Sequence, residues 1–90
     1  MLDLRKLYTF QVAAATGNFT RAAATLGCCQ SSVTVRIKAL EDELGVQLFD
    51  RCRFTKVAKL TDTGRKMLEY SRQLLTLAEE AAAAIRRPTT

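Results

Sequence analysis

Hydrogen-bonding side chains, one apolar side chain and a cation share one flank of a short segment in the middle of the chain. They are Gln30, Ser31, Thr34, Val35 and Lys38. Base pairs present hydrogen-bond donors, acceptors and the thymine methyl group at the edges that line the DNA major groove. Side chains of these types are complementary to such edges, so the sequence predicts a base-reading surface on this flank.

A helix must position these side chains, because apolar residues repeat on its other flank at steps of four, three and four. These are Val33, Ile37, Leu40 and Leu44. The spacing predicts one buried stripe of a helix over residues 30–44. A shorter helical pattern precedes it over residues 20–26, with Thr20 as its expected N-cap and Gly27 as its stop. Two helices around a glycine-containing break indicate a helix-turn-helix whose second helix is the reader.

Three further elements complete the expected fold. A first helix over residues 4–16 has Asp3 as N-cap and Gly17 as its left-handed stop, with Leu4, Leu7, Phe10 and Ala14 facing inward. Residues 49–61 predict a short β-hairpin, the wing. Thr61 caps a last helix that continues to about residue 85. The predicted fold class is mostly α, a winged helix-turn-helix of three helices and a hairpin followed by a long helix.

The domain boundaries follow from these elements. Residues 1–61 form the winged helix-turn-helix, residues 62–87 a linker or dimerisation helix and residues 88–90 a tail. The last helix carries a wide, alanine-rich apolar band made of Met67, Leu68, Ser71, Leu74, Leu75, Ala78, Ala81, Ala82 and Ile85. One short helix cannot cover so long a band, so we expect a homodimer through this helix. The alternative is that the band packs only onto the first helix of its own chain.

The positive charge is concentrated in one segment. The chain has a net charge of +5, and six cations lie between Arg51 and Lys66 against the single anion Asp62. Such clusters are typical of surfaces that contact phosphates. A solvated basic loop without a partner is the alternative interpretation.

Other classes of function find little support. The chain has no histidine, no phosphate-binding loop and no convincing carboxylate pair, because residues 41–43 (Glu-Asp-Glu) are expected to be a solvated helix end. We therefore predict no enzyme and no metal or other cofactor. The three cysteines lack zinc-site spacing and indicate reduced thiols. With no run of about 18 apolar residues and no leader, we expect a cytoplasmic protein without membrane contact.

Two alternative functions remain open. The long helix could be the functional element of a protein-interaction module, with an incidental basic surface. Cys29 could act as a thiol redox sensor, because a helix N-terminus lowers the pKa of a thiol.

Several motifs occur together and in a fixed order. They are L-x-x-L-x-x-F at residues 4–10, G-N-F-T-R-A-A at residues 17–23, Gln30 with the pair at residues 33–34, L-E-x-E-L-G-V-x-L-F-x-R at residues 40–51 and L-T-x-x-G at residues 60–64. In this order they resemble the N-terminal DNA-binding domain and linker helix of LysR-type transcriptional regulators. The resemblance covers residues 4 to about 85.

The resemblance implies a bacterial, nucleoid-associated regulator that binds double-stranded DNA as a dimer at an interrupted palindrome. It further implies a separate C-terminal domain that senses a small-molecule inducer and organises tetramers, with RNA polymerase as a candidate partner. We therefore expect this sequence to be a fragment or an engineered piece of a longer protein. Gln30 matches the family's base-reading glutamine, and Thr34 matches a serine or threonine that touches base or backbone. Candidate backbone and wing contacts are Thr20, Arg21, Ser32, Arg36, Arg51, Arg53 and Lys56.

The sequence departs from the family pattern at the start of the reading helix. Cys29 replaces the usual capping serine, Ser31 replaces a common proline, and Val35 replaces an arginine or polar residue. Losing a good N-cap costs roughly 1 kcal/mol of stability. Replacement of the family's capping serine is a simpler explanation of Cys29 than redox sensing, and Cys28 occupies an apolar position of the family pattern. Val35 is expected to contact a thymine methyl instead. Residues 51–61 are about two residues longer than usual and lack the customary glycine.

Overall fold

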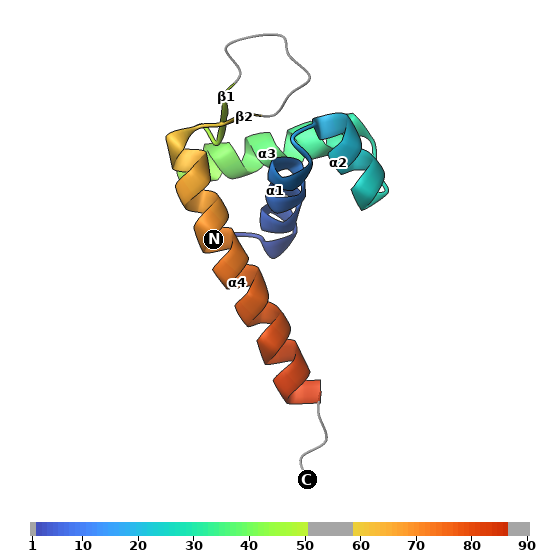
Figure 1. Cartoon of the computed structure of the whole chain (residues 1–90), viewed down its shortest axis with the longest axis vertical. Helices are drawn as coiled ribbons and strands as arrows, with labels where there is room; N and C mark the ends of the chain where they lie inside the picture. Colours follow the sequence, from blue (N-terminus) through green and yellow to red (C-terminus); the bar gives the residue numbers. More distant parts are fainter. Residues whose placement is uncertain (1, 51–58, 87–90) are drawn as a thin grey trace.

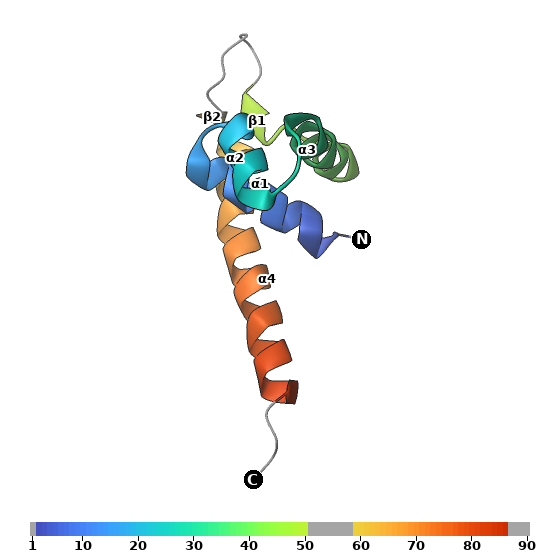
Figure 2. The same cartoon turned by 90° about the vertical axis from the view of Figure 1, so that its right-hand side faces the viewer.

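The computed structural model describes residues 2–50 and 59–86 of the 90-residue chain. Its elements are α1 (Leu4–Thr16), α2 (Phe19–Leu26), α3 (Gln30–Leu44), β1 (Phe49–Asp50), β2 (Lys59–Leu60) and α4 (Asp62–Arg86). The first three helices pack into a body at one end of α4, and α4 projects far beyond it (Figure 1, Figure 2). The two strands pair antiparallel, with Phe49 opposite Leu60. The predicted fold class is confirmed, while the expected wing residues 51–58 lie outside the described part of the chain.

Helix α1 begins and ends as its local sequence predicts. The Asp3 side chain accepts a hydrogen bond from the Arg5 N–H at 2.8 Å, and Gly17 takes the left-handed conformation with φ 66°. The inward face differs from the prediction, because Ala13 is fully buried whereas Leu4 is 46% exposed. Leu4 borders only an open hollow on the body, so burial of this residue was predicted wrongly.

Helix α2 starts one residue earlier than predicted, and Asn18 rather than Thr20 is its N-cap. The Asn18 Oδ1 accepts hydrogen bonds from the N–H groups of Thr20 and Arg21 at 2.8 and 3.1 Å. Asn18 has the extended backbone of a capping residue, with φ −157° and ψ 124°. The asparagine therefore satisfies the free backbone donors, and the hydroxyl of Thr20 is left for another contact.

The core sits where the three short helices meet the hairpin. Val33, Ile37 and Leu40 of α3 have no exposed surface, which confirms the predicted buried stripe. The ring of Phe49 from β1 packs edge-on against those of Phe10 and Phe19, with ring centroids 5.5 and 5.2 Å apart. Burial of the α3 stripe in this core fixes the orientation of α3 about its own axis.

The acidic end of α3 is solvated as predicted at Asp42 and Glu43, but the prediction was wrong for Glu41. Glu41 is only 7% exposed, and its Oε2 accepts hydrogen bonds from the N–H groups of Leu48 and Phe49 at 2.7 and 3.3 Å. Glu43 pairs with Lys6 of α1 at 2.6 Å, and this hydrogen bond raises the pKa of the lysine. Glu41 is buried because the chain turns at Gly45 (φ 69°) and brings the following backbone amides against its carboxylate.

The start of α4 is fixed against the same turn. The Thr61 N–H donates to the Leu48 carbonyl at 3.0 Å, and the Thr61 hydroxyl accepts from the Gly64 N–H at 2.9 Å, which confirms Thr61 as a cap. A Cβ atom at Gly64 would lie 2.1 Å from the Leu48 carbonyl oxygen. Only glycine fits here, because two backbones touch.

Helix α4 has 25 residues; it packs on the core as far as Leu75, and its end projects beyond the body (Figure 1). Within residues 2–50 and 59–86, none of the helices combines the length and apolarity needed to cross a bilayer.

The buried carboxylate gives a direct test of this arrangement. Glu41→Ala should lower the free energy of unfolding by about 2–4 kcal/mol, because two buried backbone donors lose a charged acceptor. Asp42→Ala is the matched control at the exposed neighbour, with an expected change within about 0.5 kcal/mol. Urea denaturation followed by circular dichroism measures both. Equal losses for the two variants would mean that the Glu41 carboxylate contributes nothing specific.

Candidate nucleic-acid interface

The predicted base-reading flank of α3 lies on the outside of the molecule. Gln30, Ser31 and Lys38 are exposed, Val35 is 66% exposed, and Thr34 is half-buried. The Thr34 hydroxyl donates to the Gln30 carbonyl at 3.1 Å, which leaves its oxygen lone pairs as acceptors. The structure thus brings these five side chains together on one accessible surface.

The starts of α2 and α3 lie side by side at one end of this surface. The Thr20 hydroxyl donates a hydrogen bond to the Gln30 Oε1 at 3.3 Å, across the turn that separates the two helices. Arg21 follows Thr20 and is exposed. Two residues predicted to touch the DNA backbone therefore lie next to the residue predicted to read a base.

The other flank of α3 faces the chain itself. The Arg36 guanidinium lies 3.8 Å from the Cys28 sulfur and lines a hollow with Tyr8 and Leu26. Ser32 is half-buried, and its hydroxyl lies 3.8 Å from the Cys29 sulfur. The structure separates Arg36 from the exposed flank, so Arg36 is less well placed for the DNA backbone than Arg21.

The N-terminus of α3 lacks a side-chain cap. Cys29 has the extended backbone of an N-cap, with φ −85° and ψ 158°, but its thiol makes no capping hydrogen bond. This is the consequence expected from replacing the capping serine. Cys28 packs half-buried beside the core, and the described residues contain no cluster of three side chains able to hold a metal ion.

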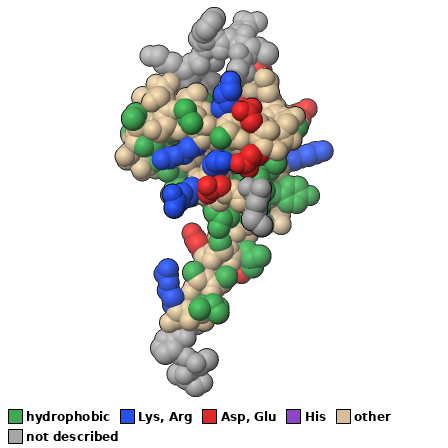
Figure 3. Space-filling view, turned by 180° about the vertical axis from the view of Figure 1, so that it is seen from behind, with side chains coloured by type: hydrophobic (Ala, Val, Ile, Leu, Met, Phe, Trp, Pro, Cys, Tyr) green, Lys and Arg blue, Asp and Glu red, His purple; other side chains and the backbone are tan. Residues whose placement is uncertain are grey.

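The cations predicted to contact phosphate are only partly within the described structure. Arg51, Arg53 and Lys56 lie outside the described residues, so their role at the wing stays a prediction. Lys59 and Lys66 are exposed. On the face seen in Figure 3, Lys and Arg side chains lie next to Asp and Glu side chains over the three-helix body. Charge on this face is mixed rather than uniformly positive.

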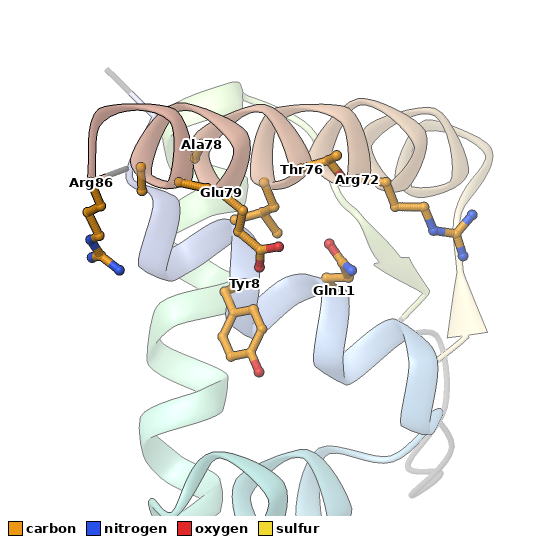
Figure 4. A pocket seen from close by; sticks show the side chains of 10 residues that line it. Tyr8, Gln11, Arg72, Thr76, Ala78, Glu79 and Arg86 are labelled. Carbon is orange, nitrogen blue, oxygen red and sulfur yellow. The ribbon is translucent and has the colours of Figure 1, made fainter. Parts of the chain in front are cut away.

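The apolar band of α4 divides into two rows. Ser71 is fully buried and donates to the Leu68 carbonyl at 2.8 Å, so its side chain is not accessible to a partner. The remaining half-buried members of this inner row are Met67, Leu68, Leu75, Ala78 and Ala82. An open groove runs along this row between α1 and α4, with Tyr8 and Gln11 on one wall and Thr76 and Glu79 on the other (Figure 4).

The outer row of α4 is exposed and contains residues that sequence reasoning missed. Tyr70 and Leu77 are 63% and 62% exposed, next to Leu74 at 38% and Ile85 at 85%. Together with Ala81 these five residues form the outer row. The first four positions (residues 70, 74, 77 and 81) follow steps of four, three and four, a signal that the sequence already contained.

Comparison with known proteins gives a consistent result. Residues 4–65 match the family model described as "Bacterial regulatory helix-turn-helix protein, lysR family". The HTH-type transcriptional regulator YwqM of Bacillus subtilis (strain 168) is 42% identical over 83 residues, which are 92% of this chain and 28% of that relative. The chain thus spans less than a third of the length of this relative.

Two solved complexes with DNA have the same fold. The CbnR DBD–DNA complex superposes with a TM-score of 0.88 at 34% identity, covering 94% of this chain and 95% of that one. The BenM DBD complex with catB site 1 DNA also gives 0.88, at 30% identity, covering 96% of this chain and 90% of that one.

The missing cap at α3 can be tested by restoring it. Cys29→Ser should raise the free energy of unfolding by about 0.5–1 kcal/mol, because a serine oxygen can accept from the free N–H groups of the first turn. Cys28→Ser is the matched control; it places a hydroxyl beside the core and should not stabilise. Thermal or urea unfolding under reducing conditions measures both. No gain at position 29 would show that a side-chain cap is not what this helix end lacks.

Proposed function

The chain belongs to the lysR family of bacterial regulatory helix-turn-helix proteins as a DNA-binding domain, and we propose that α3 reads base edges in the major groove. The exposed flank of α3 is the observation that supports this proposal. Its polar groups and Val35 are accessible, while the opposite stripe of the same helix is packed in the core. A helix held in this way can enter a groove without unfolding.

Each residue of the flank has a role that its chemistry allows. Gln30 can make two hydrogen bonds with adenine, accepting from N6 and donating to N7. The Val35 methyl groups can contact a thymine methyl, and Lys38 can donate to guanine or to a phosphate. Thr20 and Arg21, at the start of α2, can contact the backbone beside the base that Gln30 reads, and the hydrogen bond between Thr20 and Gln30 supports this role. Contacts from the wing add electrostatic affinity that does not depend on sequence.

A dimer places two such readers on one duplex. We propose that the outer row of α4, centred on Leu74 and Leu77, packs against the same row of a second copy. The inner row is covered in part by α1, whereas the outer row exposes large apolar side chains to solvent. A twofold dimer would read an interrupted palindrome, because operator symmetry mirrors protein symmetry.

We also propose properties of the whole regulator to which this domain would belong. It would have a C-terminal domain that binds a small-molecule inducer, form a tetramer and interact with RNA polymerase. It would lie in the bacterial cytoplasm at the nucleoid.

Two other functions make different predictions. A pure interaction module would dimerise through α4 without salt-dependent affinity for DNA. A thiol sensor at the exposed Cys29 would lose or gain DNA binding on treatment with peroxide. An oxidant-insensitive, salt-dependent affinity supports DNA reading over both.

The base-reading role of Gln30 has a specific signature. Sites selected from random DNA supply the operator, and Gln30→Ala should weaken operator binding by roughly 10-fold or more while binding to bulk DNA stays unchanged. Arg21→Ala is the contrasting variant. It removes a phosphate contact and should weaken both kinds of binding and reduce the salt dependence. Fluorescence anisotropy at two salt concentrations measures each; equal losses for both variants on both DNAs would remove base reading by Gln30.

The outer row of α4 can be tested separately. Leu77→Glu should weaken dimerisation by roughly 10-fold or more, because a charge buried without a partner costs several kcal/mol. Ala83→Glu adds the same charge to the same helix away from the outer row and should leave the dimer intact. Analytical ultracentrifugation measures both equilibria. An unchanged dimer in Leu77→Glu would exclude this row as the interface.

A further inference from the structure

Gln30 is poorly restrained by its own helix. It is the first residue of α3, its side chain is exposed, and the preceding Cys29 makes no side-chain cap. A free glutamine side chain loses up to about 1.5–2 kcal/mol of rotamer entropy when a contact orders it. An unrestrained amide can also turn over and exchange its oxygen for its nitrogen, which reverses its donor and acceptor.

The structure contains a group that restrains this amide. The Thr20 hydroxyl donates to the Gln30 Oε1 at 3.3 Å, although ten residues separate them in the chain. We propose that Thr20 is a positioning residue that fixes the Gln30 amide and thereby sets the preference for adenine over guanine. The proposal rests on base reading by Gln30.

The hydroxyl of Thr20 is directed differently from those of other helical threonines. Thr9, Thr25 and Thr34 each donate to the carbonyl four residues earlier in their helix. Thr20 lies in the first turn of α2 and donates to Gln30 instead.

The backbone of Thr20 is itself held firmly. The Asn18 cap accepts its N–H at 2.8 Å, and Ala22 and Ala23 bury the inner side of the same helix. The β-branched threonine side chain has only two common χ1 rotamers in a helix, so few alternatives compete with this hydrogen bond. The Thr20 hydroxyl is thus a fixed donor, suited to orient an otherwise mobile amide.

The fixed amide has a consequence for base choice. When Oε1 accepts from Thr20, its second lone pair remains for the N6 amino group of adenine, and Nε2 can donate to N7. Guanine presents the acceptor O6 where adenine presents its N6 donor, so the fixed Oε1 would face another acceptor. A glutamine side chain that is not held by Thr20 could instead change rotamer, present only its Nε2 hydrogens to the O6 and N7 acceptors of guanine and turn Oε1 away from the base. Loss of the Thr20 hydroxyl therefore reduces discrimination against guanine.

The experiment compares Thr20→Val with the matched control Thr25→Val, which removes a hydroxyl from the same helix that donates only to the Arg21 carbonyl. Affinities are measured for the selected operator, for the operator with guanine at the adenine that Gln30 reads, and for random-sequence DNA. Thr20→Val should lower the adenine-over-guanine ratio by roughly 3- to 10-fold, the effect of one hydrogen bond. Thr20→Val also removes the proposed backbone contact of Thr20 from all three DNAs, so random-DNA affinity should fall, but by less than operator affinity does. Thr25→Val and Thr20→Ser, which keeps the hydroxyl, should retain the parent ratio.

Each outcome decides the matter. An unchanged adenine-over-guanine ratio would overturn the positioning role, and equal loss of affinity on all three DNAs would show that Thr20 contacts the DNA backbone only. In a Gln30→Ala background, Thr20→Val should change the ratio no further, and a further loss would contradict action through Gln30. If Thr20→Val does not fold, Thr20→Ser is the test. A lower adenine-over-guanine ratio in this variant, which keeps the hydroxyl, would overturn the positioning role of Thr20. If Gln30→Ala alone keeps the parent ratio, base reading fails, and this result is distinct from a failure of Thr20 alone.

Discussion

The backbone of one residue, Leu48, joins the end of α3 to the hairpin and to the start of α4. Its N–H is held by the Glu41 carboxylate of α3, its carbonyl accepts from the Thr61 N–H, and the same carbonyl lies against the backbone of Gly64. Its side chain is fully buried. The end of α3, the start of the hairpin and the start of α4 therefore meet at one point with satisfied hydrogen bonds, and none of them can turn independently of the others.

In the proposed dimer, this joint would matter for DNA recognition because it relates α3 to α4, the helix through which two copies would pair. The buried stripe of α3 decides which flank is exposed, and the joint decides the angle between α3 and α4. In a dimer built through α4, that angle sets the distance and direction between the two readers. A palindromic site can be bound only if this distance and this direction both match its two half-sites. The polar contacts at Leu48 would thus act on a property of the proposed dimer, although they lie away from the exposed flank of α3.

The two ends of α3 are fixed in different ways. At its C-terminal end, a buried carboxylate and a left-handed glycine bind the helix to the next strand. At its N-terminal end, Cys29 provides no side-chain cap, and the first residue contacts the neighbouring helix through the Thr20 hydroxyl. The position of the Gln30 side chain consequently depends on the packing of α2 against α3 as well as on α3 itself.

The sequence by itself determined the helices, their glycine stops and the buried stripe of α3, because helical periodicity and glycine conformations are local properties. The described strand pair also lies where it was expected. Tertiary structure alone decided the role of Glu41, which in sequence resembles its solvated neighbour Asp42, because the amides that it accepts belong to residues beyond the following turn. It likewise decided which apolar row of α4 faces α1 and which hydroxyl meets Gln30. Such contacts join residues far apart in the chain, and no periodic pattern encodes them.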